Sequence, residues 1–241
     1  MIDYRRGRSP NALADLPDGC AACVLTDPPY GTGRTDARAR QYGRRQRNVE
    51  RGIGIANDLD LSELAACAPE FRRVLAPEGV AMVFMGPTQY RAACDVLDGA
   101  GLEVHHSLPW FKGRPGLSYR ARFAYEDIIL ATHPGVDPWP DRGPLVVPMR
   151  HASVNRPDHP NEKPVALLLE ALRWACPSGG TVVDYFAGVA SGAIAAHVAG
   201  CDWVGAECDE RWWPIAERRI ATVQDRPHPD APPSLFADGA A

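Results

Sequence analysis

Short apolar runs alternate with helical segments along most of the chain, and this alternation limits the folds that it can adopt. Apolar runs typical of strands lie at residues 1–4, 21–26, 80–85, 104–111, 125–131, 181–185 and 203–207. Apolar residues at helical spacing lie at 59–75, 88–97, 164–175, 191–199 and 210–222. Strands that alternate with helices favour parallel βαβ units, so we predict an open α/β sheet that binds its ligand at the carboxyl ends of the strands.

Composition sets the wider limits. The chain has 241 residues, 45% hydrophobic and 23% charged, which suits one large domain with a real core and excludes disorder as its main state. The longest apolar runs fall far short of a membrane span, and the first residues carry no secretory pattern. We therefore expect a cytoplasmic protein whose seven cysteines are mostly reduced. The proline-rich stretch at 133–161 predicts a loop, and the composition of residues 223–241 predicts a flexible tail.

Arginines concentrate in one segment of an otherwise acidic chain. The net charge is −4, yet residues 34–51 hold seven arginines against Asp36 and Glu50. Arginine suits planar, bidentate contact with phosphates and base edges, and Arg44, Arg45 and Arg47 are the candidate DNA contacts. Residues 31–57 show no apolar period, so a solvated loop is an equally good explanation of this charge.

The first candidate site is Thr26-Asp27-Pro28-Pro29-Tyr30-Gly31, directly after an apolar strand. Two prolines stop the strand and stiffen its exit. The Asp27 carboxylate and the Pro28 carbonyl could accept hydrogen bonds from the two N–H groups of an aromatic amine, which favours a nitrogen whose lone pair points out of the ring plane. Tyr30 could stack on a base that has left its helix. A plain Pro-Pro turn is the alternative, because so short a motif recurs by chance.

The second candidate site begins at Asp184-Tyr185-Phe186-Ala187-Gly188 and ends at Glu207. Small residues between a strand and a helix let the backbone approach a ligand, and Glu207 is placed to bond ribose hydroxyls. Only Gly188 and Gly192 occur here, so the dinucleotide fingerprint is absent and a nicotinamide cofactor is disfavoured. An ordinary βαβ turn is the alternative.

Together these motifs resemble a known family. TDPPYG at 26–31, PWFKG…FAYEDIIL at 109–130, HPNEKP at 159–164 and DYFAG at 184–188 are similar to the amino-methylating DNA methyltransferases that use S-adenosylmethionine. The catalytic motif precedes the cofactor motif, as in the permuted beta group. The resemblance covers residues 1–222. It implies a Rossmann-like methyltransferase fold: a mostly parallel, seven-stranded sheet with helices on both faces.

The resemblance also assigns residues. Asp27, Pro28, Pro29 and Tyr30 would form the catalytic pocket, and Lys163 would close the amino-acid end of the cofactor. The remaining cofactor residues would be Asp184, Phe186, Ala187, Gly188, Ser191 and Glu207. The chain departs from the family where a glycine is replaced by Ala190 and where a Gly-Asp pair is replaced by Gly7-Arg8. Alanine takes a positive φ less easily than glycine.

The predicted function is methyl transfer to adenine N6 in DNA, in the setting of restriction–modification. Asp at the first motif position favours adenine, whereas serine is more frequent in cytosine-N4 enzymes. Cytosine-N4 methylation and a non-catalytic DNA-binding protein on a degenerate methylase fold are alternatives; RNA or protein-glutamine methylation is disfavoured by the motif order.

The implied partner is double-stranded DNA with a flipped base, read by residues 31–57 and 112–157 within a single domain. A homodimer is one expected assembly; membrane and metal are not expected, since Cys20-Ala21-Ala22-Cys23 has no second ligand pair.

Overall fold

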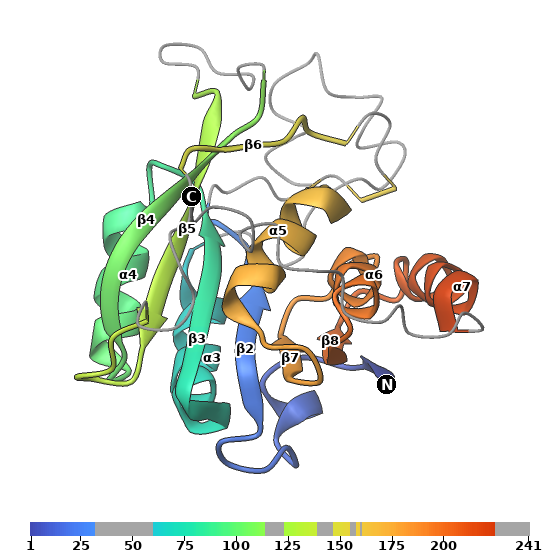
Figure 1. Cartoon of the computed structure of the whole chain (residues 1–241), viewed down its shortest axis with the longest axis horizontal. Helices are drawn as coiled ribbons and strands as arrows, with labels where there is room; N and C mark the ends of the chain where they lie inside the picture. Colours follow the sequence, from blue (N-terminus) through green and yellow to red (C-terminus); the bar gives the residue numbers. More distant parts are fainter. Residues whose placement is uncertain (32–59, 114–122, 139–146, 155–157, 160, 225–241) are drawn as a thin grey trace, which may run out of the picture.

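A computed structural model describes residues 1–31, 60–113, 123–138, 147–154, 158–159 and 161–224. A single eight-stranded sheet runs through them in the order β1-β8-β7-β2-β3-β5-β4-β6 (Figure 1). The strands are β1 (Ile2–Arg6), β2 (Ala21–Thr26), β3 (Leu75–Met85), β4 (Glu103–Phe111), β5 (Tyr125–Thr132), β6 (Met149–Arg150), β7 (Thr181–Asp184) and β8 (Asp202–Glu207). The helices are η1 (Asn11–Leu13), α3 (Ser62–Val74), α4 (Tyr90–Gly99), α5 (Val165–Ala175), α6 (Ser191–Val198) and α7 (Trp213–Gln224).

Each predicted strand and helix is present, with ends that differ by a few residues. The prediction of seven strands was wrong by one, because β6 pairs with the end of β4 through Trp110–Met149 and Phe111–Arg150. A strand of two residues in a proline-rich stretch is too short to show an alternating pattern in the sequence. The segment Pro77-Glu78-Gly79, which separates the predicted helix at 59–75 from the predicted strand at 80–85, lies inside β3. The pairing jumps from Ala21–Leu75 to Cys23–Val80, and a bulge absorbs the extra residues. Val223 and Gln224, assigned to the tail, still belong to α7.

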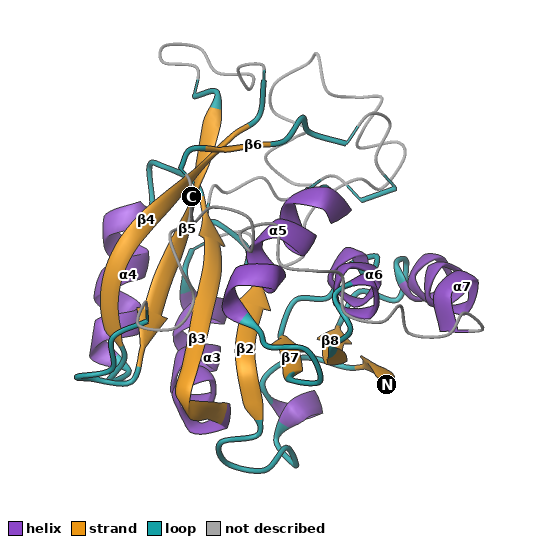
Figure 2. Cartoon of the chain, in the orientation of Figure 1, coloured by secondary structure: helices purple, strands orange, loops and turns teal. Residues whose placement is uncertain are grey.

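Helices cover both faces of the sheet (Figures 1 and 2). Helices α3 and α4 lie on one face, and α5 and α6 lie on the other, with α7 beside α6. The central strand β2 reads Ala-Ala-Cys-Val-Leu-Thr and is almost wholly buried, as expected of a strand covered on both sides. Its neighbours β3 and β7 run parallel to it. No helix in the described residues has the length and apolar character needed to cross a membrane.

The direction of the strands fixes which ends meet. Strands β1, β8, β7, β2 and β3 are parallel, so Asp27 and Asp184 come to the same edge of the sheet. Strand β5 is antiparallel to β3, with Asp127 opposite Met85. The amino end of β5 and the carboxyl end of β4 therefore reach that same edge. This reversal brings residues from 111–127 beside the carboxyl ends of the parallel strands.

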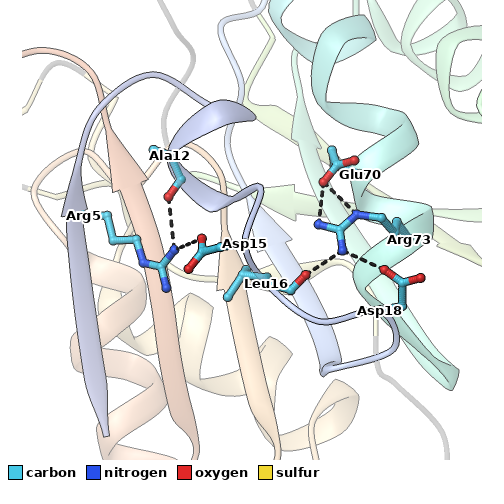
Figure 3. A network of polar contacts seen from close by, with 7 residues as sticks. All are labelled: Arg5, Ala12, Asp15, Leu16, Asp18, Glu70 and Arg73. Carbon is cyan, nitrogen blue, oxygen red and sulfur yellow. Dashed lines mark hydrogen bonds and ion pairs between the residues drawn. The ribbon is translucent and has the colours of Figure 1, made fainter.

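An arginine network ties α3 to the segment that leads into β2 (Figure 3). The Arg73 guanidinium donates to Glu70 within the helix at 2.6 Å and, outside it, to the Leu16 carbonyl at 2.6 Å and to Asp18 at 2.8 Å. A second cluster joins Arg5 of β1 to Asp15 and to the Ala12 carbonyl. Arg73 is three-quarters buried, so these charge-assisted bonds hold the chain at the entrance to β2.

We expect Arg73→Met to lower the free energy of unfolding by about 1.5–3 kcal/mol. The substitution removes hydrogen bonds between charged groups and leaves a partly buried carbonyl without a donor. Urea denaturation measures the change. The control is Arg91→Met, which removes an exposed i,i+4 pair with Asp95 and should change stability by less than about 0.5 kcal/mol. Equal effects of the two substitutions would show that the Arg73 network adds nothing specific.

Candidate functional site

One cavity opens at the carboxyl edge of the sheet. Its empty volume is about 850 Å³, the open mouth included, which lies within the range of small-molecule sites. Its lining includes all but one of the catalytic and cofactor residues predicted from the sequence: Asp27, Pro28, Pro29, Lys163, Asp184, Phe186, Ala187, Gly188, Ser191 and Glu207. The exception is Tyr30. Residues separated by up to 180 positions in the chain thus share one pocket.

Asp27 presents one bonded and one free carboxylate oxygen. It follows β2 directly, and Pro28 and Pro29 hold the exit of the strand. Its Oδ2 accepts from the Lys163 ammonium at 2.5 Å. Its Oδ1 is buried and has no hydrogen-bond partner among the described residues. Burial raises the pKa of Asp27, and the Lys163 charge opposes that rise. A buried acceptor without a donor marks a place for a ligand N–H group.

Lys163 lines the cavity beside Asp27. Its ammonium contacts Asp27 and, at 3.4 Å, Glu126, and its expected contact with the amino-acid end of the cofactor stays a prediction. The two carboxylates raise the pKa of Lys163 although burial acts against them. A buried ammonium is retained only where carboxylates compensate it, and Asp27 and Glu126 are the carboxylates in reach.

Tyr30 does not line the cavity. Its side chain is buried, its hydroxyl donates to Glu126 Oε2 at 2.9 Å, and its ring lies close to Gly86. The phenol is thus held by a carboxylate partner inside the protein, and the stacking of Tyr30 on a base stays a prediction. Burial and the two neighbouring carboxylates raise the pKa of Tyr30.

Sequence reasoning missed Glu126 and did not weigh Lys112. Both lie in the stretch 109–130, which was noted only as similar to the family. The Lys112 ammonium bonds Glu126 Oε1 at 2.8 Å. Two consecutive carboxylates, Glu126 and Asp127, before the apolar run of β5 were the available signal, since a carboxylate on a buried strand needs a partner.

Asp184 closes the other wall of the cavity. Its Oδ1 accepts from the Thr26 hydroxyl at 2.8 Å and from the Phe186 N–H at 3.1 Å. Burial raises the pKa of Asp184 to about 7. Thr26 precedes Asp27, so this hydrogen bond joins the end of β2 to the end of β7. The two candidate sites of the sequence are thereby held to each other.

Glu207 at the end of β8 fixes the small-residue turn. Its carboxylate accepts from the Gly188 N–H at 2.8 Å and from the Asp209 N–H at 2.7 Å. Burial raises the pKa of Glu207. In the described residues neither Glu207 nor Asp184 forms an ion pair. Asp184 is buried and Glu207 is partly buried, so this end of the cavity holds two carboxylates without a cationic partner in that part of the chain. Two such acceptors favour a cationic or hydroxyl-bearing ligand.

Three further groups line this end without having been assigned. His159, from the HPNEKP stretch, packs edge-on against Trp212 with ring centroids 4.7 Å apart, and burial lowers its pKa to about 4. Glu162 bonds Arg219 at 2.7 Å and the Ser191 hydroxyl at 3.4 Å. These contacts hold Ser191 at the start of α6.

Ala190 has a left-handed backbone conformation at the position where the family motif has glycine. Its φ is +60° and its ψ +34°, the left-handed region, directly before α6. No other described residue apart from glycine has a positive φ. The turn geometry thus survives the loss of glycine, at a conformational cost of about 1–2 kcal/mol. Arg8, the second departure, pairs with Glu63 of α3 and does not line the cavity. Arg44, Arg45 and Arg47 lie outside the described residues.

Comparison with known proteins assigns the fold. A family model described as "DNA methylase" (N6_N4_Mtase) matches residues 139–218. The Escherichia coli (strain K12) protein named "Putative methylase YubD" is 27% identical over 230 residues, which cover 93% of this chain and 92% of that protein. The M1.HpyAVI–SAM complex superposes with a TM-score of 0.66 at 18% identity, covering 91% of this chain and 99% of that one. The PvuII cytosine-N4-specific DNA methyltransferase superposes with a TM-score of 0.68 at 16% identity, covering 92% of this chain and 90% of that one.

The fold is that of a methyltransferase. The Rossmann-like architecture predicted from the sequence is thereby confirmed, with its mostly parallel sheet and helices on both faces. The family match begins before β6 and ends within α7, so it includes Lys163, Asp184 and Glu207 but does not reach Asp27.

Ala190→Gly should stabilise the protein by up to about 1 kcal/mol, as measured by urea denaturation. Relief of the left-handed alanine gains about 1–2 kcal/mol, and the loss of one buried methyl group offsets about 0.8 kcal/mol of it. The control is Ala193→Gly within α6, where φ is helical and the same change should cost about 1 kcal/mol. If both substitutions destabilise alike, Ala190 stores no strain.

Asp184→Asn should stabilise the ligand-free protein by about 1–4 kcal/mol at pH 8 and much less at pH 4. The pKa of Asp184 is about 7 in the folded state against 3.8 for the free side chain. The folded state therefore binds more protons between these values, so wild-type stability falls as pH rises from about 4 to 7 and is level above. Asparagine keeps an acceptor for Thr26 and removes the charge.

Thermal denaturation across this pH range measures the difference between variant and wild type. Asp60→Asn is the control, because the pKa of that exposed carboxyl is lowered by its hydrogen bonds to Ser62 and its substitution should bring no gain above pH 7. A gain from Asp184→Asn that is equal at pH 4 and pH 8 would contradict the assignment.

Proposed function

We propose that this chain is an S-adenosylmethionine-dependent DNA methyltransferase that acts on an exocyclic amine, with adenine N6 as the favoured target. The observation that carries the proposal is the free Oδ1 of Asp27, a buried acceptor in the same cavity as the carboxylates of Asp184 and Glu207. The family match at 139–218 and the methyltransferase fold support it. So does the agreement between the sequence motifs and the lining of the cavity.

The cofactor end of the cavity fits S-adenosylmethionine by its charges. In the described residues Asp184 and Glu207 have no cationic partner, and the cofactor bears an ammonium and a sulfonium. Glu207 would bond the ribose hydroxyls, Asp184 and Ser191 would face the amino-acid end, and Phe186 with Ala187 and Gly188 would form the floor. When bound, the cofactor supplies an electrophilic methyl group whose bonding electrons stay with sulfur as the methyl leaves.

Asp27 and the Pro28 carbonyl would prepare the nucleophile. Each accepts one N–H of the target amine, which turns the nitrogen lone pair out of the ring plane and toward the methyl donor. A new N–C bond forms at that nitrogen, and the ammonium product passes its surplus proton to Asp27 or to water. The target atom lies inside duplex DNA, so the base must flip into the cavity.

Adenine N6 and cytosine N4 present the same two N–H groups to Asp27. Asp rather than Ser at position 27 favours adenine. Cytosine N4 remains the alternative, since the family model spans both chemistries and the PvuII enzyme is cytosine-N4-specific. Arg44, Arg45 and Arg47 follow Tyr30 in the chain, and we place them on DNA phosphates beside the flipped base.

A non-catalytic DNA-binding protein is the second candidate. The changes at Ala190 and Arg8 suggested it, but Ala190 keeps the turn and Arg8 stays clear of the cavity. An intact acceptor at Asp27 has no use in a protein that only binds. The methyl-transfer function therefore accounts for more of the site.

Two substitutions should distinguish the role of Asp27 in methyl transfer from the role of Glu207 in cofactor binding. Asp27→Ala is expected to reduce methyl transfer by about 10²-fold or more while S-adenosylmethionine still binds, because the lost acceptor acts on the amine. Glu207→Ala is expected to weaken S-adenosylmethionine binding by about 1.5–3 kcal/mol and to retain transfer when the cofactor saturates. Calorimetry gives the affinities, and transfer of labelled methyl to mixed-sequence DNA gives the rates.

Mapping of modified bases in DNA from expressing cells identifies adenine or cytosine and the flanking sequence. Wild-type protein that binds S-adenosylmethionine yet leaves DNA unmodified, both in vitro and in cells, would overturn the catalytic proposal in favour of the binding one. Asp27→Ala that transfers within severalfold of wild type would remove Asp27 from the mechanism.

A further inference from the structure

The only two lysines of this arginine-rich chain meet at one carboxylate. Lys112 and Lys163 are 51 positions apart in a sequence with 26 basic residues, and both bond Glu126. Lys112 contacts Oε1 at 2.8 Å, and Lys163 contacts Oε2 at 3.4 Å. A lysine ammonium is a compact point charge with three rotatable donors, so it can turn toward acceptors that do not lie in the plane of a rigid guanidinium fork.

The Lys163 ammonium has three protons and three acceptors in reach. It donates to Asp27 Oδ2 at 2.5 Å and to the Asn161 carbonyl at 3.3 Å, and it forms an ion pair with Glu126 Oε2 at 3.4 Å. With the third proton attracted to Glu126, none is left for Asp27 Oδ1, the oxygen of Asp27 that has no partner in the described residues. Glu126 thus accounts for the free oxygen, since it takes the donor that would otherwise turn to it.

Glu126 also fixes Tyr30. The phenol donates to Glu126 Oε2 at 2.9 Å, and Tyr30 lies three residues after Asp27 in the chain. Glu126 therefore accepts from groups on three segments: the exit of β2, the residue after β4 and the loop before α5. Its side chain is 16% exposed, and those of Lys163 and Asp27 are 6% and 19% exposed. At this burial a missing charge would leave the others uncompensated.

We propose that Glu126 is a positioning residue for methyl transfer, which binds one donor of Lys163 and the Tyr30 hydroxyl so that Asp27 Oδ1 stays free for the target amine. The inference rests on the proposed function. It differs from a purely structural role for the ion pairs, because it assigns to Glu126 an effect on the charge and the hydrogen bonding of Asp27.

The charges around Asp27 give the expected sign. Asp27 faces Lys163 and Glu126, with Tyr30 and, from β7, Asp184 nearby; Lys163 also faces His159. The negative charge of Glu126 raises the pKa of Asp27 and of Lys163. Glu126→Gln removes that charge, so both pKa values should fall. The freed Lys163 proton should then compete with substrate for Oδ1.

The first experiment needs no activity. Two lysines give two side-chain signals in protein labelled with ¹⁵N and ¹³C lysine. In Glu126→Gln both signals should shift, and the pKa of Lys163 should fall. The matched control is Asp127→Asn, the next carboxylate on β5, which bonds Ser107 instead and should leave both signals in place. Unchanged lysine signals in Glu126→Gln would show that the network does not exist in solution and would overturn the proposal.

The second experiment measures single-turnover methyl transfer to DNA against pH, with S-adenosylmethionine saturating. Glu126→Gln should lower the plateau rate by about 10–10²-fold, since small misplacements of a reacting group cost that much. The acid limb of its profile should move to lower pH, because Asp27 loses its proton more readily. Affinities for S-adenosylmethionine and DNA should stay within about twofold of wild type. Glu126→Asp, which restores the charge, should return the acid limb toward its wild-type position.

The outcomes are separable. An unchanged rate and profile in Glu126→Gln, with wild type active, overturns the positioning role alone. A lower rate with an unmoved acid limb and a lower melting temperature means that Glu126 is structural, and this too overturns it. An inactive wild type overturns the proposed function and the positioning role together, and the lysine signals still report whether the charge network is present.

Discussion

Two carboxylates and two ammonium groups lie together at the carboxyl edge of the sheet, and their mutual neutralisation fixes the arrangement of the site. The charges alternate along the series Asp27, Lys163, Glu126 and Lys112, and their sum is zero. Each charge would be costly to bury alone, so each holds its neighbours in place. Because these groups come from the exits of β2 and β4, the start of β5 and the loop before α5, the chain of charges also joins the parallel and antiparallel parts of the sheet.

At the opposite end of the cavity the carboxylates are not neutralised by neighbouring cations in the described residues. Asp184 and Glu207 have no cationic partner in that part of the chain, and burial raises the pKa of both. A protein selected only for stability would not keep two such carboxylates in one pocket. The cavity therefore has one end where Lys163 neutralises Asp27 and another where Asp184 and Glu207 lack a cation among the described residues. The Thr26 hydroxyl, bonded to Asp184, links the two.

Most of the fold could be predicted because its elements are long and periodic. β2 was assigned at its observed ends, and α5 and α6 within one residue. What failed was short or irregular: β6 has two residues, and the bulge in β3 hides a Pro-Glu-Gly turn inside a strand. The identity of the pocket could also be predicted, since Asp27 and Asp184 each end a parallel strand and such ends meet at one edge.

The roles of Lys163, Tyr30 and Glu126 could not be predicted, because they depend on distances between segments. The resemblance placed Lys163 near the cofactor, and only the fold shows that its ammonium also contacts Asp27. Tyr30 was expected in the cavity, but its hydroxyl bonds Glu126, which lies on β5 almost a hundred positions later in the chain.

The sequence by itself determined the alternation of strands and helices, the acceptor at Asp27 and the small turn before α6, since periodicity, proline and residue size act locally. Only the tertiary structure decided which charges meet. The antiparallel return of β5 brings Glu126 to the edge where the parallel strands end, and pairing across the sheet is a property of three-dimensional packing that no local pattern encodes.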